Sequence, residues 1–337
     1  MREKPNLQDD KICACLREQY GLSVTELTFL PLGFDSAVGV YRVQAADGQP
    51  YFLKVRRGPV AESALRVAYA LKDQGIAQVV APLAMPAGRL WQQLEQFTLV
   101  LYPFIAGKSG METGLSHRQW TEFGTVLSKL HAARLPPDLA AQVRVEDFVP
   151  NPSSAAVICQ LQATIHQRAS NHPSEQALFA FWQEKREVIG QVLARAEALG
   201  RRLHASGPEM VLCHADIHTA NTLLTEDGQL FIVDWDQPIF APKERDLMFV
   251  IDDVVGDSRT TACFFQGYGE AEVDALTLAY YRYEWAVQDI GAFAAQVLEE
   301  EGSDQSKQEG LHWFKVQFGP GNSVDTARVL DDLFFNS

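Results

Sequence analysis

The stretch that most constrains the fold of this chain is residues 211–236, VLCHADIHTANTLLTEDGQLFIVDWD. It begins with a short apolar run, and a polar loop follows as far as Asn221. Thr222–Thr225 and residues 229–233 are predicted to be the two strands of a hairpin, because Glu-Asp-Gly at positions 226–228 favours a tight turn. The hairpin is expected to bring the end of its second strand back beside the polar loop.

Four polar side chains flank this hairpin. Asp216 and Asn221 lie in the loop before it, and Asp234 and Asp236 follow its second strand. Carboxylate and amide oxygens that converge in this way suit hard divalent cations and phosphate oxygens. Two of the four also have a structural interpretation. Asn221 could cap its own loop, and Asp236 could form a structural bond to the loop rather than contact a substrate.

The histidines and the cysteine of the same stretch are expected to matter less. His214 is predicted to brace the loop by packing and by hydrogen bonds to the backbone, and no function is predicted for His218. A metal site built from Cys213, His214 and His218 is a weak alternative. These residues mix sulfur and nitrogen donors at irregular spacing, and no second cluster of ligands accompanies them.

The charge of the chain limits its partners. The 337 residues include 29 Lys and Arg against 43 Asp and Glu, which gives a net charge of −14. Nucleic acids need a basic surface, so this charge argues against them as the main partner. The acidity could serve solubility alone, and it indicates a cationic substrate more weakly. No apolar run is long enough for a membrane span or a signal peptide, and the five cysteines are scattered. A cytoplasmic protein with reduced thiols is therefore expected.

The pattern of apolar residues predicts an α+β fold with two domains. Strands are predicted at residues 27–32, 40–44, 50–55, 79–83, 90–94 and 97–102, with a helix at residues 60–74. The sequence then breaks at PFIAG, residues 103–107, and long helical patterns dominate the rest. We expect an N-terminal domain at residues 1–103, built from an antiparallel sheet plus a helix, and a larger, mainly helical domain at residues 104–337.

Two charged residues of the first domain could act together with the hairpin stretch. Lys54 interrupts an apolar strand, and alternation places it opposite Leu53 and Val55, where it is either a solvated lysine or a functional one. Glu62 stands in the first turn of the following helix, where it could simply favour the positive helix end. In a phosphate-transfer site, the lysine could contact nucleotide phosphates and the glutamate could hold the lysine. Asp216 could then orient an attacking hydroxyl group.

The ordered set of motifs resembles the aminoglycoside phosphotransferase family. The residues that carry the resemblance are Lys54 in Phe-Leu-Lys-Val, His214-Ala-Asp216-Ile-His-Thr-Ala-Asn221, and Ile232-Val-Asp234-Trp-Asp236. Within this family the stronger resemblance is to the spectinomycin phosphotransferases. It rests on Tyr102-Pro-Phe-Ile, Cys213-His-Ala-Asp-Ile-His and Ala241-Pro-Lys-Glu-Arg-Asp-Leu-Met-Phe249. The resemblance extends from about residue 30 to residue 283.

The resemblance implies a bilobal protein-kinase-like fold, with the nucleotide bound by residues 1–103. ATP is the implied phosphate donor, with GTP as an alternative, and Mg²⁺ is the implied cofactor. By position, Asp216 is the implied catalytic residue, and Asn221 and Asp234 are the implied Mg²⁺ ligands. The implied nucleotide-binding residues are Ser36, Lys54, Glu62, Pro103 and Ile105. The loop that contains Ser36 lacks the glycine-rich pattern of protein kinases.

The acceptor is expected to be a small molecule. Only residues 237–242 separate Asp236 from the next predicted helix, which leaves no room for the long activation and peptide-binding segment of protein kinases. The resemblance implies transfer to a hydroxyl group of spectinomycin or a related aminocyclitol, and hence antibiotic resistance. Kinases of choline, homoserine, methylthioribose or fructosamine are alternatives within the fold. A non-catalytic pseudokinase is an alternative of another class, and the oligomeric state is left open.

Candidate substrate residues lie mostly on one predicted helix at residues 272–301. Tyr281, Glu284, Trp285 and Gln288 share one face of it, because they fall at positions i, i+3, i+4 and i+7. Aromatic rings and an acid on one face could bind a cationic sugar-like ring, although aromatic residues at this spacing are also typical of a packing face. Further candidates are Trp235, Asp236 and Asp289, of which Trp235 could instead belong to the core.

Overall fold

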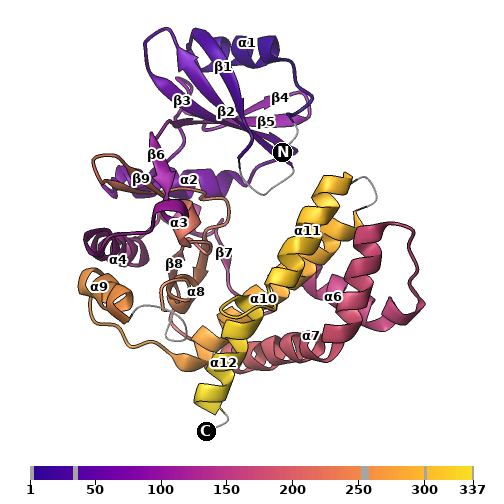
Figure 1. Cartoon of the computed structure of the whole chain (residues 1–337). Coiled ribbons are helices and arrows are strands. Elements are labelled where there is room, and N and C mark those ends of the chain that lie inside the picture. The colour runs from indigo at the N-terminus through magenta and orange to yellow at the C-terminus, as the bar shows by residue number, and fades with distance from the viewer. Residues whose placement is uncertain (1–3, 33–36, 252–257, 300–301, 336–337) are drawn as a thin grey trace. The chain divides into compact units, whose positions relative to one another are not determined.

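A five-stranded antiparallel sheet with the strand order β1–β2–β3–β5–β4 forms the N-terminal part of the chain (Figure 1). Its strands are β1 (Val24–Leu30), β2 (Val38–Ala45), β3 (Pro50–Arg57), β4 (Gln92–Leu94) and β5 (Phe97–Pro103). The Asp47-Gly48 turn between β2 and β3 forms as predicted, with Gly48 at a φ of 82° and the Asp47 side chain bonded to the amide of Gln49. The structure is a computed structural model that describes residues 4–32, 37–251, 258–299 and 302–335.

The strand predicted at residues 79–83 is wrong. This segment is buried but makes only an isolated bridge, from Val79 to Ile232. The amide of Val80 donates to the carbonyl oxygen of Ile232, and Pro82 then lacks the amide hydrogen that a longer ladder would need.

Helices cover both faces of the five-stranded sheet. Helix α1 (Asp9–Tyr20) packs Ile12 and Leu16 into a cluster with residues of one sheet face, including Leu53 and Val55. Helix α2 (Glu62–Asp73) places Leu65 against Val100 on the opposite face. Since residues alternate along a strand, Lys54 lies on the α2 face of the sheet, between two residues that face α1.

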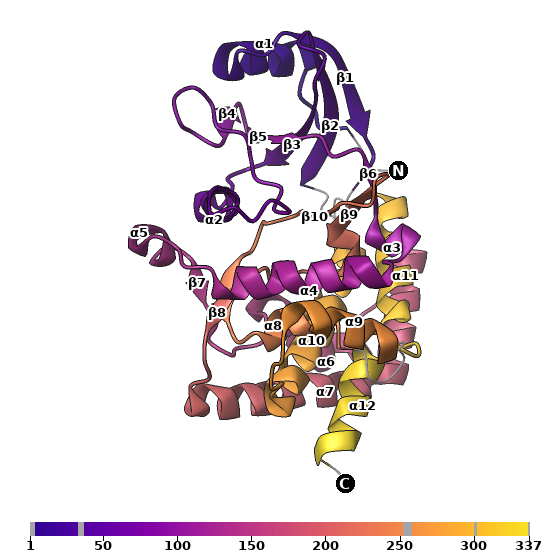
Figure 2. The same ribbon diagram turned by 90° about the vertical axis from the view of Figure 1, so that its left-hand side faces the viewer.

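The first of two compact units comprises Met1–Arg144, Leu212–Phe240 and Cys263–Gly269. Beyond the sheet, α1 and α2, its elements are β6 (Gly107–Ser109), α3 (Gly110–Thr113), α4 (His117–Ala132), α5 (Pro137–Ala140), η2 (Thr219–Asn221), β9 (Thr222–Thr225), β10 (Leu230–Ile232) and most of α9 (Ser258–Tyr268). Strands β10, β9 and β6 form a second sheet in this order. Helices α4 and α9 lie close together (Figure 2), because Gly124 has no side chain and any Cβ there would lie 2.1 Å from the carbonyl oxygen of Phe264.

The second unit comprises Val145–Val211, Ala241–Ala262 and Glu270–Ser337, and it is mainly helical. Its helices are α6 (Pro152–Thr164), η1 (Ile165–Gln167), α7 (Pro173–Ser206), α8 (Glu244–Leu247), α10 (Ala275–Leu298), α11 (Asp304–Val316) and α12 (Ser323–Phe335). Helix α10 contacts α6, α7, α11 and α12 and supplies the centre of this core. A third sheet has the order β7 (Arg144–Val145), β11 (Ile239–Ala241) and β8 (Val211–Cys213).

The observed elements confirm the predicted α+β class, with an antiparallel sheet in the N-terminal part and mainly helices in the remainder. The helix predicted at residues 243–255 is much shorter, since α8 ends at Leu247, and residues 252–257 lie outside the described residues. The functional division at residue 103 stays a prediction. None of the described helices is both long enough and apolar enough to cross a membrane.

Candidate active site

The hairpin predicted in residues 211–236 is present, and it brings its two polar ends together. Strands β9 and β10 pair antiparallel, and Gly228 in their turn has a φ of 83°, which glycine adopts without strain. The amide of Val233 donates to the carbonyl oxygen of Asn221 at 3.0 Å. The last residue of the polar loop therefore lies beside the residues that follow β10.

His214 connects the loop to the strand exit, as a brace would. The amide of Asp216 donates to its Nδ1 at 3.3 Å, so Nε2 carries the proton and donates to the carbonyl oxygen of Val233 at 3.0 Å. The buried ring also packs edge-on against Trp235, with 4.5 Å between ring centroids. Because the backbone engages both ring nitrogens, the metal site considered for Cys213, His214 and His218 is wrong with respect to His214.

The carboxylate of Asp216 is held from two sides. Nδ2 of Asn221 donates to Oδ2 of Asp216 at 3.0 Å and to the Asp216 carbonyl oxygen at 2.8 Å. Nε2 of His218 lies 3.2 Å from the other carboxylate oxygen, Oδ1. The Asp216 side chain is still 39% exposed. A carboxylate that is both oriented and accessible can accept a proton from a hydroxyl group or orient that group.

Asn221 and Asp234 offer oxygen atoms that fit a magnesium ion. Both hydrogen bonds of the Asn221 amide nitrogen go to Asp216, so the amide oxygen is the atom that remains to contact an ion. The Asp234 carboxylate is 43% exposed, which leaves room for water. Carboxylate and amide oxygens together with water are the ligands that Mg²⁺ prefers. When bound there, the ion would neutralise charge on phosphate oxygens.

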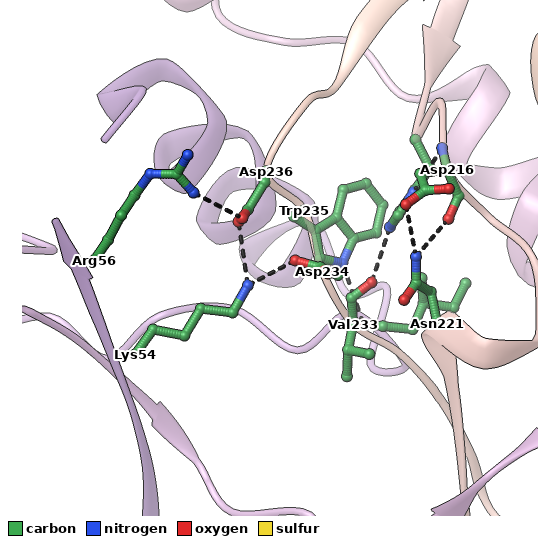
Figure 3. A network of polar contacts seen from close by, with 10 residues as sticks. Lys54, Arg56, Asp216, Asn221, Val233, Asp234, Trp235 and Asp236 are labelled. Atoms are coloured by element: carbon green, nitrogen blue, oxygen red, sulfur yellow. Dashed lines mark hydrogen bonds and ion pairs between the residues drawn. The ribbon is translucent and has the colours of Figure 1, made fainter. Parts of the chain in front are cut away.

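Lys54, on β3, reaches Asp234 and Asp236, the two aspartates that follow β10 (Figure 3). Its Nζ lies 2.6 Å from Oδ1 of Asp234 and 3.3 Å from Oδ1 of Asp236. Burial works against the charged ammonium, yet the two carboxylates outweigh it and raise the pKa of Lys54 above its ordinary value. Lys54 is therefore a cation at neutral pH, as a contact with phosphate groups requires.

Glu62 does not form the predicted ion pair with Lys54. Among the described residues, the ion pairs of Lys54 are those with Asp234 and Asp236. The Glu62 carboxylate instead accepts a hydrogen bond from Nε1 of Trp91 at 3.3 Å, in the first turn of α2. The physical reason is that two carboxylates already neutralise the ammonium, whereas Glu62 is favoured at the positive end of its own helix. A role for Glu62 in nucleotide binding stays a prediction.

The residues predicted to bind the purine lie at the end of β5. Pro103 is the last residue of this strand, and Ile105 is half-buried in the connection to β6. The ring of Tyr102, one residue earlier, has its centroid 6.0 Å from Nζ of Lys54, and burial raises the pKa of its hydroxyl group. The backbone contacts predicted for Pro103 and Ile105 stay predictions, and Ser36 lies outside the described residues.

The helix face predicted to contact the substrate is covered by Arg245 of α8. The Arg245 guanidinium lies 5.6 Å from the ring centroids of both Tyr281 and Trp285, and its Nη1 lies 3.8 Å from Oε2 of Glu284. Nε2 of Gln288 also donates to both carboxylate oxygens of Glu284, at 2.6 Å. Burial of Tyr281 and Glu284 favours the packing interpretation for these two. Trp285 and Gln288 are half-buried, and a substrate contact from them stays a prediction.

The remaining substrate candidates differ in their surroundings. Trp235 is 5% exposed and donates from Nε1 to the carbonyl oxygen of Ile232 at 3.1 Å, which favours the core interpretation. Asp236 is 41% exposed and binds Lys54, so its carboxylate has a structural partner within the chain. Asp289 is half-buried on α10. Asp236 and Asp289 stay candidates for contact with a substrate.

Two backbone positions in the site adopt the left-handed conformation without being glycine. Ala215, directly before the proposed catalytic residue Asp216, has a φ of 73°. Asp234 has a φ of 66°. Residues with a side chain pay a conformational cost there, and such residues concentrate at functional sites. In this chain the left-handed conformation turns the backbone at the two places where the polar side chains emerge.

Comparison with known proteins decides the family. The model of the phosphotransferase enzyme family matches residues 26–287, which is most of the chain. The chain belongs to the phosphotransferase enzyme family. It is a small-molecule kinase with the kinase-like fold of the aminoglycoside phosphotransferases, as predicted.

Individual known proteins are similar over 80% of the chain or more. The crystal structure of spectinomycin phosphotransferase, APH(9)-Ia, in complex with ADP and spectinomycin has 30% sequence identity and a TM-score of 0.87, and the match covers 97% of this chain and 99% of that chain. Its AMP-bound complex has 29% identity and a TM-score of 0.82, with 96% and 98% covered. Protein StrN of Streptomyces griseus is 26% identical over 283 residues, which are 80% of this chain and 79% of StrN.

Three residues of this phosphotransferase contribute to the clusters described above although no function was predicted for them. Arg56 places Nη1 4.0 Å from Oδ2 of Asp236, His218 contacts Asp216, and Arg245 covers the face of α10. Strand alternation could have found Arg56, since it lies two residues after Lys54 on the same face. His218 lies in an irregular loop, and Arg245 is distant in sequence from its partners, so no local pattern indicates either contact.

Proposed function

We propose that this phosphotransferase moves the γ-phosphate of MgATP to a hydroxyl group of spectinomycin or a related aminocyclitol. One observation supports this type of reaction: a single compact unit contains both the Asp216–Asn221 loop and the Lys54–Asp234 ion pair. Phosphoryl transfer depends mainly on positioning and on charge neutralisation, and these groups offer both. The acceptor is inferred from the similarity to spectinomycin phosphotransferase.

In the proposed reaction, Asp216 orients the acceptor hydroxyl group and takes its proton. The hydroxyl oxygen forms a bond to the γ-phosphorus while the bond from that phosphorus to the oxygen of the leaving ADP breaks. Lys54 binds the α- and β-phosphates as a fixed cation, and Asn221 and Asp234 hold Mg²⁺. The hydrogen bond from Asn221 keeps the Asp216 carboxylate oriented throughout.

The proposed acceptor is a cationic molecule, which agrees with the net charge of −14. Of the candidates for contact with it, Trp285, Gln288 and Asp289 of α10 are half-buried, and Asp236 is 41% exposed. We propose that residues 1–103 bind the nucleotide and that the backbone of Pro103 and Ile105 contacts the purine. Resistance to spectinomycin would follow if the phosphate prevents the drug from binding its target.

The deciding experiment is mass spectrometry of spectinomycin after incubation with the protein and MgATP or MgGTP. We expect spectinomycin to gain one phosphate. The nucleotide that gives the larger yield, MgATP or MgGTP, identifies the donor. Asp216→Asn should lower kcat by roughly 10²- to 10⁴-fold, the usual contribution of a general base. Asp73→Asn, which changes an exposed aspartate at the end of α2, is the matched control and should leave kcat unchanged.

Other outcomes would redirect the proposal. If spectinomycin gains no phosphate but choline, homoserine, methylthioribose or a fructosamine does, the fold and mechanism hold and the acceptor is wrong. If the protein binds nucleotide but phosphorylates no acceptor of this panel, the acceptor is another small molecule and the proposed acceptor class is wrong. Full activity of Asp216→Asn would remove Asp216 from the catalytic role.

A further inference from the structure

Arg56 shares one face of β3 with Lys54. Leu53 and Val55 are fully buried on the opposite face, so alternation directs Lys54 and Arg56 to the same side of the sheet. Both residues lie opposite apolar residues of β2, where Val40 pairs with Lys54 and Val38 pairs with Arg56. The sheet therefore presents two cations, two residues apart, toward the residues that follow β10.

Asp236 contacts both of these cations with a single carboxylate (Figure 3). Oδ1 of Asp236 lies 3.3 Å from Nζ of Lys54, and Oδ2 lies 4.0 Å from Nη1 of Arg56. A separation of 4.0 Å is an ion pair without a close hydrogen bond, so Asp236 attracts the guanidinium without fixing its geometry. A guanidinium has five N–H donors and can bind a carboxylate and phosphate oxygens together.

The charges around Arg56 favour an anion as its ligand. Among the described residues, Lys54 and Arg56 are the cations that contact Asp234 and Asp236, so this cluster holds two cations and two carboxylates. A nucleoside triphosphate with several negative charges needs more positive charge than Lys54 supplies. The proposed acceptor is itself cationic and would be repelled by Arg56. As a purely structural pair, Arg56 and Asp236 would contribute little, because their side chains are 35% and 41% exposed.

We propose that Arg56 is a further phosphate-binding residue, which contacts the terminal phosphates of the nucleotide, and that Asp236 is its positioning residue. The proposal rests on the proposed function, since it assumes that Lys54 binds the same nucleotide. It assigns the guanidinium to the β- and γ-phosphates, because Arg56 lies two residues beyond Lys54 on the same strand and farther from the strand end that pairs with Pro103.

The test is isothermal titration calorimetry of the full-length protein with three probes: AMP, ADP and a non-hydrolysable ATP analogue, each with Mg²⁺. Arg56→Gln should raise the Kd of the triphosphate analogue roughly tenfold, the effect of losing one charge-assisted hydrogen bond. The Kd of AMP should stay within about twofold of the wild-type value, since AMP lacks the phosphates concerned. Arg56→Lys, which keeps the charge but not the paired donors, should give a Kd for the analogue between these two values.

Arg57→Gln is the matched control. Arg57 is the next residue on β3, is exposed, and faces the other side of the sheet, so its replacement should leave all three Kd values unchanged. The proposal would be overturned if Arg56→Gln kept the wild-type Kd for the triphosphate analogue. It would also be overturned if the Kd values of AMP and of the analogue rose by the same factor. If the wild-type protein binds none of the three nucleotides, the proposed function fails instead, which separates the two results.

Discussion

The β3 cluster (Lys54, Arg56, Asp234 and Asp236) and the α10 cluster (Arg245, Tyr281, Glu284 and Trp285) are built from the same kinds of group. Each combines cations with carboxylates, and in each a cation lies near an aromatic ring. Their exposure differs greatly: the carboxylates of the β3 cluster are 43% and 41% exposed, against 9% for Glu284. Exposed carboxylates can exchange a protein cation for a ligand, whereas a buried carboxylate that did so would leave its arginine without charge compensation.

The largest effect is expected in the α10 cluster. Glu284→Leu should lower the free energy of unfolding by about 3 kcal/mol, because it leaves the buried Arg245 guanidinium without its carboxylate. Glu284 is also the main reason why the pKa of Arg245 is raised despite burial, so the charge cannot simply be lost. Urea unfolding followed by circular dichroism measures the change.

The control for this prediction removes both charges. The double variant Arg245→Met with Glu284→Leu should recover most of the lost stability, since apolar residues of similar volume replace a buried pair at little cost. If Glu284→Leu costs under about 1 kcal/mol but abolishes binding of spectinomycin, the α10 face is a substrate site and the comparison with the β3 cluster fails.

A smaller effect of another kind is expected in the β3 cluster. Lys54→Met should lower kcat/KM by about 100-fold, the usual cost of removing one preorganised charge from a transition state. Its free energy of unfolding should change by no more than about 1 kcal/mol, since Asp234 and Asp236 remain hydrated. Steady-state kinetics and urea unfolding of the same preparation measure both. A loss of stability as large as the loss of activity would show that the cluster is structural.

Trp235 tests whether burial separates structural residues from functional ones. It is buried, although the side chains of Asp234 and Asp236 on either side are 43% and 41% exposed. Trp235→Phe removes the hydrogen bond to the carbonyl oxygen of Ile232, which keeps its bond from the amide of Val80. We expect a loss of about 1 kcal/mol in thermal or chemical unfolding, with the KM for the acceptor unchanged. A raised KM with unchanged stability would assign Trp235 to the substrate instead.

The smallest effect concerns pH. The hydrogen bond from Lys307, at 2.7 Å, lowers the pKa of Glu175 below its ordinary value of 4.5. Because the folded state holds this carboxylate ionised, the pair stabilises the protein above that ordinary value, and the stabilisation is lost as the pH falls through the lowered pKa. Glu175→Gln should therefore be less stable than the wild type at pH 7 by about 1 kcal/mol, the net value of one hydrogen bond, with the difference vanishing in acid. A difference that persists at low pH would contradict the electrostatic origin.

The local parts of the fold were predictable from the sequence. The Asp47-Gly48 and Glu-Asp-Gly turns predicted two hairpins, because few residues tolerate the backbone of a tight turn. The spacing of Asp216, Asn221 and Asp234 likewise predicted that they would meet, since a hairpin returns the chain to its starting point.

The contacts between distant elements were not predictable in this way. Helical spacing showed that Tyr281 and Glu284 share a face, but it contains no information about what covers that face, which is Arg245. The same limit explains Glu62: its position in the first turn of α2 was correct, but its partner is Trp91 rather than Lys54. Which side chain a charged residue contacts depends on which groups the fold brings closest to it. Those groups come from segments far apart in the chain, so a local sequence pattern does not reveal them.

The left-handed backbone at Ala215 and Asp234 has a consequence for laboratory evolution. Glycine is relaxed at the φ values of 73° and 66° that these residues adopt, so a screen for heat resistance alone would favour glycine at both positions. At position 215 the change removes a buried methyl group but no functional group. At position 234 glycine would remove the carboxylate that contacts Lys54. Selection for heat resistance and selection for turnover should therefore agree at position 215 and diverge at position 234.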